Sequence, residues 1–381
     1  MQFRDIIGQE DIASHLRQGV RSGRVSHAQL FGGKAGYGGY ALALAYLQYL
    51  MCESPSEEDS CGVCAACRQC ESMTHPDVHF VMPVNRQGKK SGQTPMSSEF
   101  LPLWRELSLS SGGYLSPSQW SKALDLGKTL SATIAAKEAD SIISQLALKS
   151  YSGGYKVVII WQPEAMNESA ANKILKVLEE PYPQTLFLLI SEQPQLLLPT
   201  ILSRTQAVTI PPIAPERLVE WLASNGVGES GNHRGMARLS GGDVIELRDI
   251  AKGDRNEQRE QDFELFTSVM RLSYNDKHLE LIEWAQRVAT LPRQGQTSFL
   301  RYSSALLREA YIMHAGLSQI SYLWGEEEDF CRKFSPFIGS GNIERLIQEI
   351  EQALVELRHN TNPSILFTHF ALKISKDINR L

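Results

Sequence analysis

A glycine-rich turn near the N-terminus constrains this chain more than any other feature. Residues 33–40 read Gly-Lys-Ala-Gly-Tyr-Gly-Gly-Tyr, which puts Gly33 and Gly38 at the two glycine positions of a phosphate-binding loop. A largely apolar stretch precedes this glycine turn at 28–31, and an alanine- and leucine-rich run follows it at 41–50. A strand, a glycine turn and a helix in this order predict an α/β domain with a parallel sheet.

The residues that would do chemistry in the glycine turn are missing. A working loop carries a lysine that neutralises the β- and γ-phosphates, followed by a serine or threonine that ligates Mg²⁺. This chain has Gly39 and Tyr40 at those positions, and Lys34 lies five residues too early to substitute. The candidate nucleotide-contacting residues are Gly33, Gly36, Gly38, Gly39 and Tyr40. The sequence leaves open whether this degenerate set still holds a nucleotide.

Two further apolar runs extend the predicted sheet. Residues 157–160 and 186–190 are short and apolar, which is typical of buried parallel strands. Residues 170–180 between them form a strong helical pattern that ends at Pro181. This spacing predicts a strand–helix–strand unit.

The strand at 157–160 lacks the acidic pair that an ATPase needs at its end. The aspartate that would organise Mg²⁺ is Trp161, and the glutamate that would polarise the attacking water is Gln162. Glu164 comes two residues too late, and we expect it to be a surface acid where a helix begins. Because both halves of the phosphoryl-transfer apparatus fail independently, we predict that this chain does not hydrolyse ATP.

Five of the six cysteines fall within nineteen residues, and their spacing predicts a metal site. They are Cys52, Cys61, Cys64, Cys67 and Cys70. Four thiolates that meet at one point make a closed tetrahedral zinc site, which is structural because no coordination position stays open. A reduced thiol cluster and a redox pair are the alternatives. Five thiols compete for four places, so spacing alone does not decide whether Cys67 or Cys70 is the last ligand.

Changes in composition and the positions of prolines divide the chain into three predicted domains. The α/β domain covers 1–210 and contains the cysteine module at 52–70. It also contains an insertion at about 84–125, rich in Ser, Gly, Lys and Gln, which we expect to be a partly mobile, solvated loop with a short helix. A proline pair opens a small helical unit at 211–253, and a nearly all-helical domain follows at 254–381.

Charge and hydropathy limit the function classes. The net charge of −5 argues against a protein that covers nucleic acid without sequence preference. It does not argue against a local basic surface that contacts nucleic acid. No run of 18 or more apolar residues occurs, and the first residues do not resemble a signal peptide. We therefore expect a soluble, cytoplasmic protein with no membrane partner.

A short arginine motif follows the strand at 186–190. Residues 198–205 read Leu-Pro-Thr-Ile-Leu-Ser-Arg-Thr. Alone, Arg204 would be a surface or ion-paired arginine. An arginine on a rigid segment can also neutralise the γ-phosphoryl group bound by another subunit, because its planar guanidinium matches that charge distribution.

In combination, these motifs resemble the δ′ subunits of bacterial DNA polymerase III clamp loaders, a family of AAA+ proteins. The segments that carry the resemblance are 3–9, 27–33, the cysteines from Cys52 to Cys67, His75-Pro76-Asp77, 172–181, 198–204 and Asn360-x-Asn362-Pro363. Together they span most of the chain except the insertion. Two departures are Thr205, where the family motif has cysteine, and Val244, near which the catalytic subunits carry an arginine.

The resemblance implies a function for each part of the chain. It implies that Cys52, Cys61, Cys64 and Cys67 hold Zn²⁺ and that Cys70 is spare. It implies that residues 211–253 form a lid and that residues 254–381 form an oligomerising collar. The family loads a ring-shaped sliding clamp onto primer–template DNA, with γ/τ and δ subunits as partners. In such a ring this chain would be a stator whose Arg204 acts in trans on a neighbouring ATP site.

Two other functions remain open at this stage. One is an active γ/τ-type ATPase with unusual motifs, which Gly39 and Trp161 disfavour. The other is a stand-alone zinc-dependent DNA-binding protein, which would need a basic surface around the cysteines. The charged neighbours of the cysteines are Glu53, Glu57, Glu58, Asp59, Arg68 and Glu71, so that surface is acidic.

Overall fold

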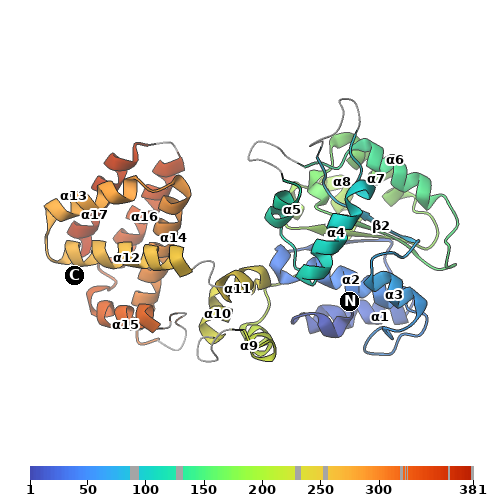
Figure 1. The fold of residues 1–381 in the computed structure, drawn as a ribbon, viewed down its shortest axis with the longest axis horizontal. Coiled ribbons are helices and arrows are strands. Elements are labelled where there is room, and N and C mark those ends of the chain that lie inside the picture. The colour runs from blue at the N-terminus through green and yellow to red at the C-terminus, as the bar shows by residue number, and fades with distance from the viewer. Residues whose placement is uncertain are drawn as a thin grey trace. The chain divides into compact units, whose positions relative to one another are not determined.

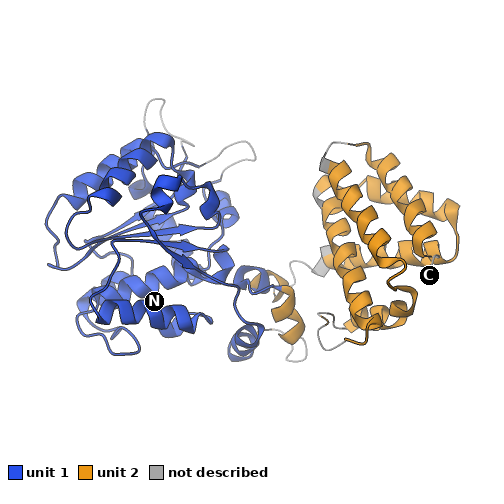
Figure 2. Ribbon diagram, turned by 180° about the vertical axis from the view of Figure 1, so that it is seen from behind, with its two compact units in different colours: residues 1–226, 240–247 blue, residues 227–239, 248–381 orange. Residues whose placement is uncertain are grey.

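A computed structural model describes residues 1–85, 94–125, 132–227, 233–251, 256–317, 321, 323, 325–358 and 361–378. The chain divides into two compact units (Figure 2): residues 1–226 with 240–247, and residues 227–239 with 248–381. None of the described helices is both long and apolar enough to cross a bilayer.

The first unit is built on five parallel strands (Figure 1). They are β1 (Ala28–Gly32), β2 (Val78–Val81), β3 (Lys156–Trp161), β4 (Thr185–Ser191) and β5 (Gln206–Thr209). The strand order is β2-β3-β4-β1-β5. β1 pairs with β4 on one side and β5 on the other, so it is an interior strand. The glycine turn therefore lies at the carboxyl edge of the sheet, where ligands of open α/β sheets bind.

Helices cover both faces of the sheet. The helices of this region are α1 (Glu10–Arg21), α2 (Gly39–Met51), α3 (Ala65–Glu71), α4 (Ser97–Ser111), α5 (Pro117–Ala123), α6 (Ala136–Leu146), α7 (Glu168–Glu179) and α8 (Pro199–Leu202). Short 3-10 turns occur at Phe3–Asp5, Ala35–Tyr37, Pro163–Ala165 and Pro194–Leu196. This unit is therefore an α/β domain, with a five-stranded parallel sheet between layers of helices.

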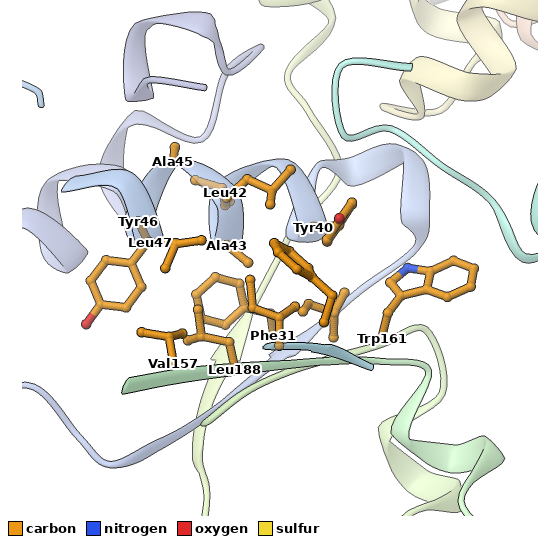
Figure 3. Packing of buried hydrophobic residues seen from close by; sticks show 14 of the residues in the cluster. Phe31, Tyr40, Leu42, Ala43, Ala45, Tyr46, Leu47, Val157, Trp161 and Leu188 are labelled. Atoms are coloured by element: carbon orange, nitrogen blue, oxygen red, sulfur yellow. The ribbon is translucent and has the colours of Figure 1, made fainter. Parts of the chain in front are cut away.

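The side chains of β3 show why both faces need helices. Val157, Ile159 and Trp161 pack in the hydrophobic cluster that contains α1, α2 and α4. Val158 and Ile160 point the other way, into a cluster with α6 and α7. Successive side chains of a strand alternate between faces, so a strand buried on both sides reads as a continuous apolar run. Figure 3 shows the first face, with α2 lying over the strands.

The described part of the predicted insertion is a packed element, so the expectation of a solvated loop is wrong. Residues 94–125 form α4 and α5, and Trp104 and Trp120 are each only 1% exposed. Trp120 Nε1 donates to Pro83 O at 2.7 Å. Residues 86–93 lie outside the described residues. The prediction failed because it was based on the polar residues of this segment, whereas its two tryptophans are large side chains that belong to the core.

Asp77 fastens the loop that leads into β3. Its carboxylate accepts hydrogen bonds from Tyr151 N at 2.7 Å, Ser152 N at 2.9 Å and Ser152 Oγ at 2.7 Å. Ser150 Oγ donates to it as well, at 3.1 Å. Burial alone would raise the pKa of Asp77, but the hydrogen bonds outweigh burial and lower it. The folded state therefore favours the ionised carboxylate.

We expect Asp77→Asn to lower the free energy of unfolding by about 1–3 kcal/mol at pH 7, because an amide nitrogen would face donors. The pKa of Asp77 is lower in the folded state, so its contribution is present above the unfolded value and is lost as pH falls toward the folded one. Urea unfolding between neutral and acidic pH measures both effects. Asp140→Asn, at an exposed ion pair with Lys173, is the control. If Asp77→Asn and Asp140→Asn lowered the free energy of unfolding equally, the stabilising role of the Asp77 hydrogen bonds would be contradicted.

Three helices connect the sheet to the second unit. They are α9 (Pro215–Ser224), α10 (His233–Leu239) and α11 (Val244–Ala251). α9 and the first turn of α11 group with the sheet, whereas α10 groups with the second unit. The predicted boundary near 253 falls among residues that are not described. The division at 211 and 253 into a lid and a collar therefore stays a prediction.

The second unit is helical in its described part. Its helices are α12 (Asn256–Tyr274), α13 (His278–Ala289), α14 (Arg293–His314), α15 (Gly325–Phe334), α16 (Ile343–Arg358) and α17 (Pro363–Ile378), with a 3-10 turn at Ser335–Phe337. The apolar stripe of α16 faces the core, where Leu346 and Ile350 are fully buried. Asn362 Oδ1 accepts from Ser364 N at 3.0 Å at the start of α17, and Asn360 lies outside the described residues.

Candidate functional site

The glycine turn keeps the backbone of a phosphate-binding loop. A 3-10 turn, Ala35–Tyr37, joins β1 to α2. Gly38 has φ of 90°, a left-handed conformation that favours glycine. A Cβ on Gly33 would lie 2.6 Å from Ile210 O, so the backbone passes too close for a side chain. These two glycines are explained by the shape of the turn alone.

Carboxylates of the chain itself lie on the glycine turn. Glu192, directly after β4, accepts a hydrogen bond from Ala35 N at 2.8 Å. Asp243, directly before α11, packs on Gly36, where an added Cβ would lie 1.6 Å from Asp243 Oδ1. The same oxygen accepts from Ile245 N at 2.9 Å. Backbone N–H groups at such a turn are anion-binding groups, and here an internal anion uses one of them.

The carboxylate on the turn is partly shielded from water. Burial raises the pKa of Glu192, the hydrogen bond from Ala35 N lowers it, and the nearby charge of Asp243 raises it again. The net shift is upward. An incoming phosphate would meet these two acidic side chains, and the positive charge of Lys34 offsets only part of the shift at Glu192. Like charges repel at this range, so the electrostatics oppose a nucleotide.

Tyr40 and Trp161, which stand where an ATPase has its Mg²⁺-binding hydroxyl and aspartate, both contact Trp104. Together with Trp120 they form an aromatic cluster. Trp104 Nε1 donates to Tyr40 Oη at 3.0 Å, and Tyr40 Oη is 3.1 Å from Ser108 Oγ. The Trp104 ring lies 4.9 Å from the Trp161 ring and 5.4 Å from the Tyr40 ring. Tyr40 and Trp161 are labelled in Figure 3. α4 thus fills the space beside the positions where Mg²⁺ ligands would stand.

Glu164, the acidic residue nearest to Trp161 in the sequence, is not an exposed carboxylate that could replace the missing catalytic glutamate. Gln162 begins the turn after β3 with φ of 55°. Glu164 is half-buried, and burial is the main cause that raises its pKa. The expectation that Glu164 is a surface acid is therefore wrong, because its side chain is half-buried and its Oε2 atom is shielded from solvent.

Arg204 stands apart from the glycine turn. It follows α8, and its Nη1 donates to Thr200 O at 3.1 Å and to Ser203 Oγ at 3.2 Å. Its Nη2 lies 2.7 Å from Glu179 Oε1, and the side chain is 36% exposed. The guanidinium is held in place yet accessible from outside the chain. None of its described contacts is with the glycine turn.

Four of the five clustered cysteines converge. The Sγ atoms of Cys52, Cys61, Cys64 and Cys67 all lie within 4.8 Å of one another, and the group does not include Cys70. Cys61 Sγ and Cys67 Sγ are 3.8 Å apart. A tetrahedral site with Zn–S bonds of about 2.3 Å requires sulfurs about 3.8 Å apart. The cysteine cluster therefore fits a structural metal site, and geometry selects Cys67 over Cys70.

Backbone amides support the thiolates of the cysteine cluster. Cys61 N donates to Cys52 Sγ at 3.2 Å, and Cys64 N donates to Cys61 Sγ at 3.4 Å. Hydrogen bonds from Val63 N and Cys64 N lower the pKa of Cys61 to about 6. Burial raises the pKa of Cys67. A bound divalent cation would deprotonate such thiols outright.

The loop between the cysteines is fastened to the N-terminus. Asp59 Oδ1 accepts from Phe3 N at 3.1 Å, and Asp59 Oδ2 accepts from Arg4 N at 3.0 Å. Gln48 Nε2, on α2, donates to Ser60 Oγ at 3.1 Å. The cysteine module therefore ties the start of the chain to α2.

Sequence reasoning missed three residues of this site. Glu192 could have been suspected, because it directly follows a buried parallel strand, where site residues gather. Asp243 stands before a helix, as an N-capping aspartate does. Trp104 carried no local signal, since its partners come from α2 and β3. The missed residues are those that close the glycine turn.

Comparisons with known proteins show the family to which this chain belongs. The family described as DNA polymerase III, delta subunit matches residues 8–214, more than half of the chain. The chain is 26% identical to DNA polymerase III subunit delta' of Escherichia coli (strain K12), over 79% of this chain and 74% of that protein. It is 32% identical to the delta' subunit of Pseudomonas aeruginosa, over 62% of this chain and 59% of that protein, so it spans about three fifths of that relative.

One solved structure aligns with most of the chain at low identity. A DNA polymerase III, gamma subunit-related protein from Thermotoga maritima aligns with 96% of this chain and 99% of its own, at 15% identity and a TM-score of 0.37. The family match covers β1–β5, the glycine turn, the cysteine cluster and Arg204. The chain belongs to the DNA polymerase III delta-subunit family.

Proposed function

We propose that this chain is a non-hydrolysing, δ′-type subunit of a DNA polymerase III clamp loader. In this proposal it is a stator that supplies Arg204 in trans to a neighbouring ATPase subunit while the sliding clamp is loaded on primed DNA. One observation carries the proposal: the chain's own glycine turn is occupied by its own side chains, whereas Arg204 is accessible. Such a chain can assist ATP hydrolysis without performing it.

The identity of the partners rests on the relatives. Curated relatives include delta' subunits and, at 25% identity over 53% of this chain, the tau subunit of Escherichia coli (strain K12). We propose γ/τ and δ subunits as direct partners, with the clamp and the primer–template DNA contacted through the assembled complex. The helical second unit would supply the oligomerising collar.

The arginine in trans would couple hydrolysis to assembly. A guanidinium stabilises the charge that develops on the γ-phosphoryl group in the transition state. Arg204 reaches a neighbour's nucleotide only when the two subunits are packed together. Hydrolysis would then be slow in free subunits and fast in the complete ring.

The cysteine cluster has a structural role in this proposal. Its four sulfurs would hold Zn²⁺, which cross-links the end of α2, the loop 53–60 and α3. All four positions of a tetrahedral ion would be filled, so the site offers none for a substrate.

We expect the isolated chain neither to bind nor to hydrolyse ATP. A nucleotide at a hundred times its dissociation constant would raise the free energy of unfolding by about 2.7 kcal/mol. Thermal unfolding with and without millimolar Mg·ATP should therefore coincide, and phosphate release should equal the background. A γ/τ-type subunit that binds ATP serves as the positive control. Turnover above background would contradict the proposal and favour an active ATPase.

A stand-alone DNA-binding protein built around zinc is the second candidate, and the structure speaks against it. The acidic side chains Glu57 and Asp59 lie beside the cysteine cluster, and Arg21 is already paired with Glu57. Proteins that bind DNA without partners present basic surfaces to the phosphates. Binding of the isolated chain to duplex DNA at physiological salt would revive this candidate.

A further inference from the structure

Glu179 ties Arg204 to a different part of the fold. It is the last residue of α7, whose inner face packs against the sheet through Ile174 and Leu178. Its Oε1 lies 2.7 Å from Arg204 Nη2. The other described acceptors of the guanidinium, Thr200 O and Ser203 Oγ, are within four residues of Arg204. Among the described contacts, Glu179 alone connects the guanidinium to the rigid sheet.

Three acceptors on two sides define the orientation of the guanidinium. Nη1 is held by Thr200 O and Ser203 Oγ, and Nη2 is held by Glu179. Arginine has a long side chain whose rotamer freedom is lost when it binds, and a guanidinium that is already oriented loses less of it. Fixing both terminal nitrogens also fixes the plane in which the remaining N–H groups point.

We infer that Glu179 is a positioning residue that pre-orients Arg204 for the neighbouring ATP site. The inference rests on the proposed function of Arg204. The pair is 36% and 42% exposed, and exposed ion pairs are weak. Glu179 therefore cannot withhold Arg204 from a phosphate, which carries more charge and more acceptor oxygens. It is strong enough to bias the arginine toward one rotamer before the subunits meet.

The test uses a complex reconstituted with γ/τ- and δ-type partners, in which the ATP sites that do not face Arg204 are inactivated. Glu179→Ala should lower kcat by about two- to fivefold with little change in the KM for ATP, since a fivefold change corresponds to about 1 kcal/mol. Glu179→Gln should retain most of the activity, because its amide oxygen still accepts from Nη2. Glu180→Ala removes the same charge from the next, exposed residue and should have no effect.

A double-mutant cycle separates positioning from a general structural effect. In an Arg204→Ala background, Glu179→Ala should cause no further loss, because the group that it orients is gone. An equal loss in both backgrounds would overturn the inference, and so would a faster rate in Glu179→Ala. If Arg204→Ala lowers the rate and Glu179→Ala does not, the inference alone fails. If Arg204→Ala has no effect, the proposed function itself fails.

Discussion

Replacing Arg204 with alanine is expected to lower the rate of ATP hydrolysis at the site that it completes by roughly 10³-fold or more, the range known for arginine fingers. The variant should fold and assemble normally, because the side chain is partly exposed and its ion pair with Glu179 lies at the surface. Arg204→Lys should recover little, since a lysine keeps the charge but lacks the planar fork.

The measurement must isolate one site. In an otherwise active ring, the loss is diluted by the sites that Arg204 does not touch. Inactivating those sites in the partner subunits and following a single turnover exposes the full effect. Arg217→Ala is a matched control, because Arg217 is also an exposed, ion-paired arginine of the sheet unit. A rate in Arg204→Ala that matches this control would remove the finger role.

Removing the Zn²⁺ that we propose for the cysteine cluster is expected to have the second-largest effect. Structural zinc binds zinc-finger peptides with an apparent free energy of about 10–16 kcal/mol, which matches or exceeds the roughly 5–15 kcal/mol that stabilises a whole domain. A module that depends on such a site should not stay folded without it. We expect about one zinc per chain, and chelation or Cys64→Ser should unfold residues 52–71.

Hydrogen exchange can follow this unfolding locally. The amides of Phe3 and Arg4 bind Asp59, so they should lose protection together with the cysteine module, whereas β3 and β4 stay protected. Cys70→Ala is the matched control, because Cys70 is a buried thiol outside the cysteine cluster. It should keep one zinc per chain. Zinc lost from Cys70→Ala and kept in Cys64→Ser would reverse the assignment of ligands.

Local patterns explain which parts of the fold could be predicted. The strands β3 and β4 are uninterrupted apolar runs, and the helix between them ends at a proline, so neighbours in sequence carry the information. The four converging cysteines lie within sixteen residues, so their spacing alone pointed to this part of the chain as a candidate metal site. The degenerate positions Gly39 and Tyr40 were recognised because the pattern of a phosphate-binding loop is also local.

Distant contacts explain what the sequence could not predict. Trp104 lies 64 residues from Tyr40, to which it donates a hydrogen bond, and the surrounding composition suggested a loop. Glu192 is 157 residues from Ala35, and its carboxylate accepts a hydrogen bond from the backbone N–H of Ala35. No periodicity or motif links such pairs, because the sheet alone brings them together. The filling of the glycine turn is therefore a tertiary property.

The carboxylates of Glu192 and Asp243 give the glycine turn an occupant that never dissociates. An ordinary nucleotide site exchanges its ligand with the cell, so its occupancy reports the supply of ATP. Here the occupant is covalently part of the chain and is set once, when the protein folds. If this occupant excludes nucleotides, as we propose, the site carries no information about cellular energy, and any such signal would reach this chain through the neighbouring subunits of the proposed complex.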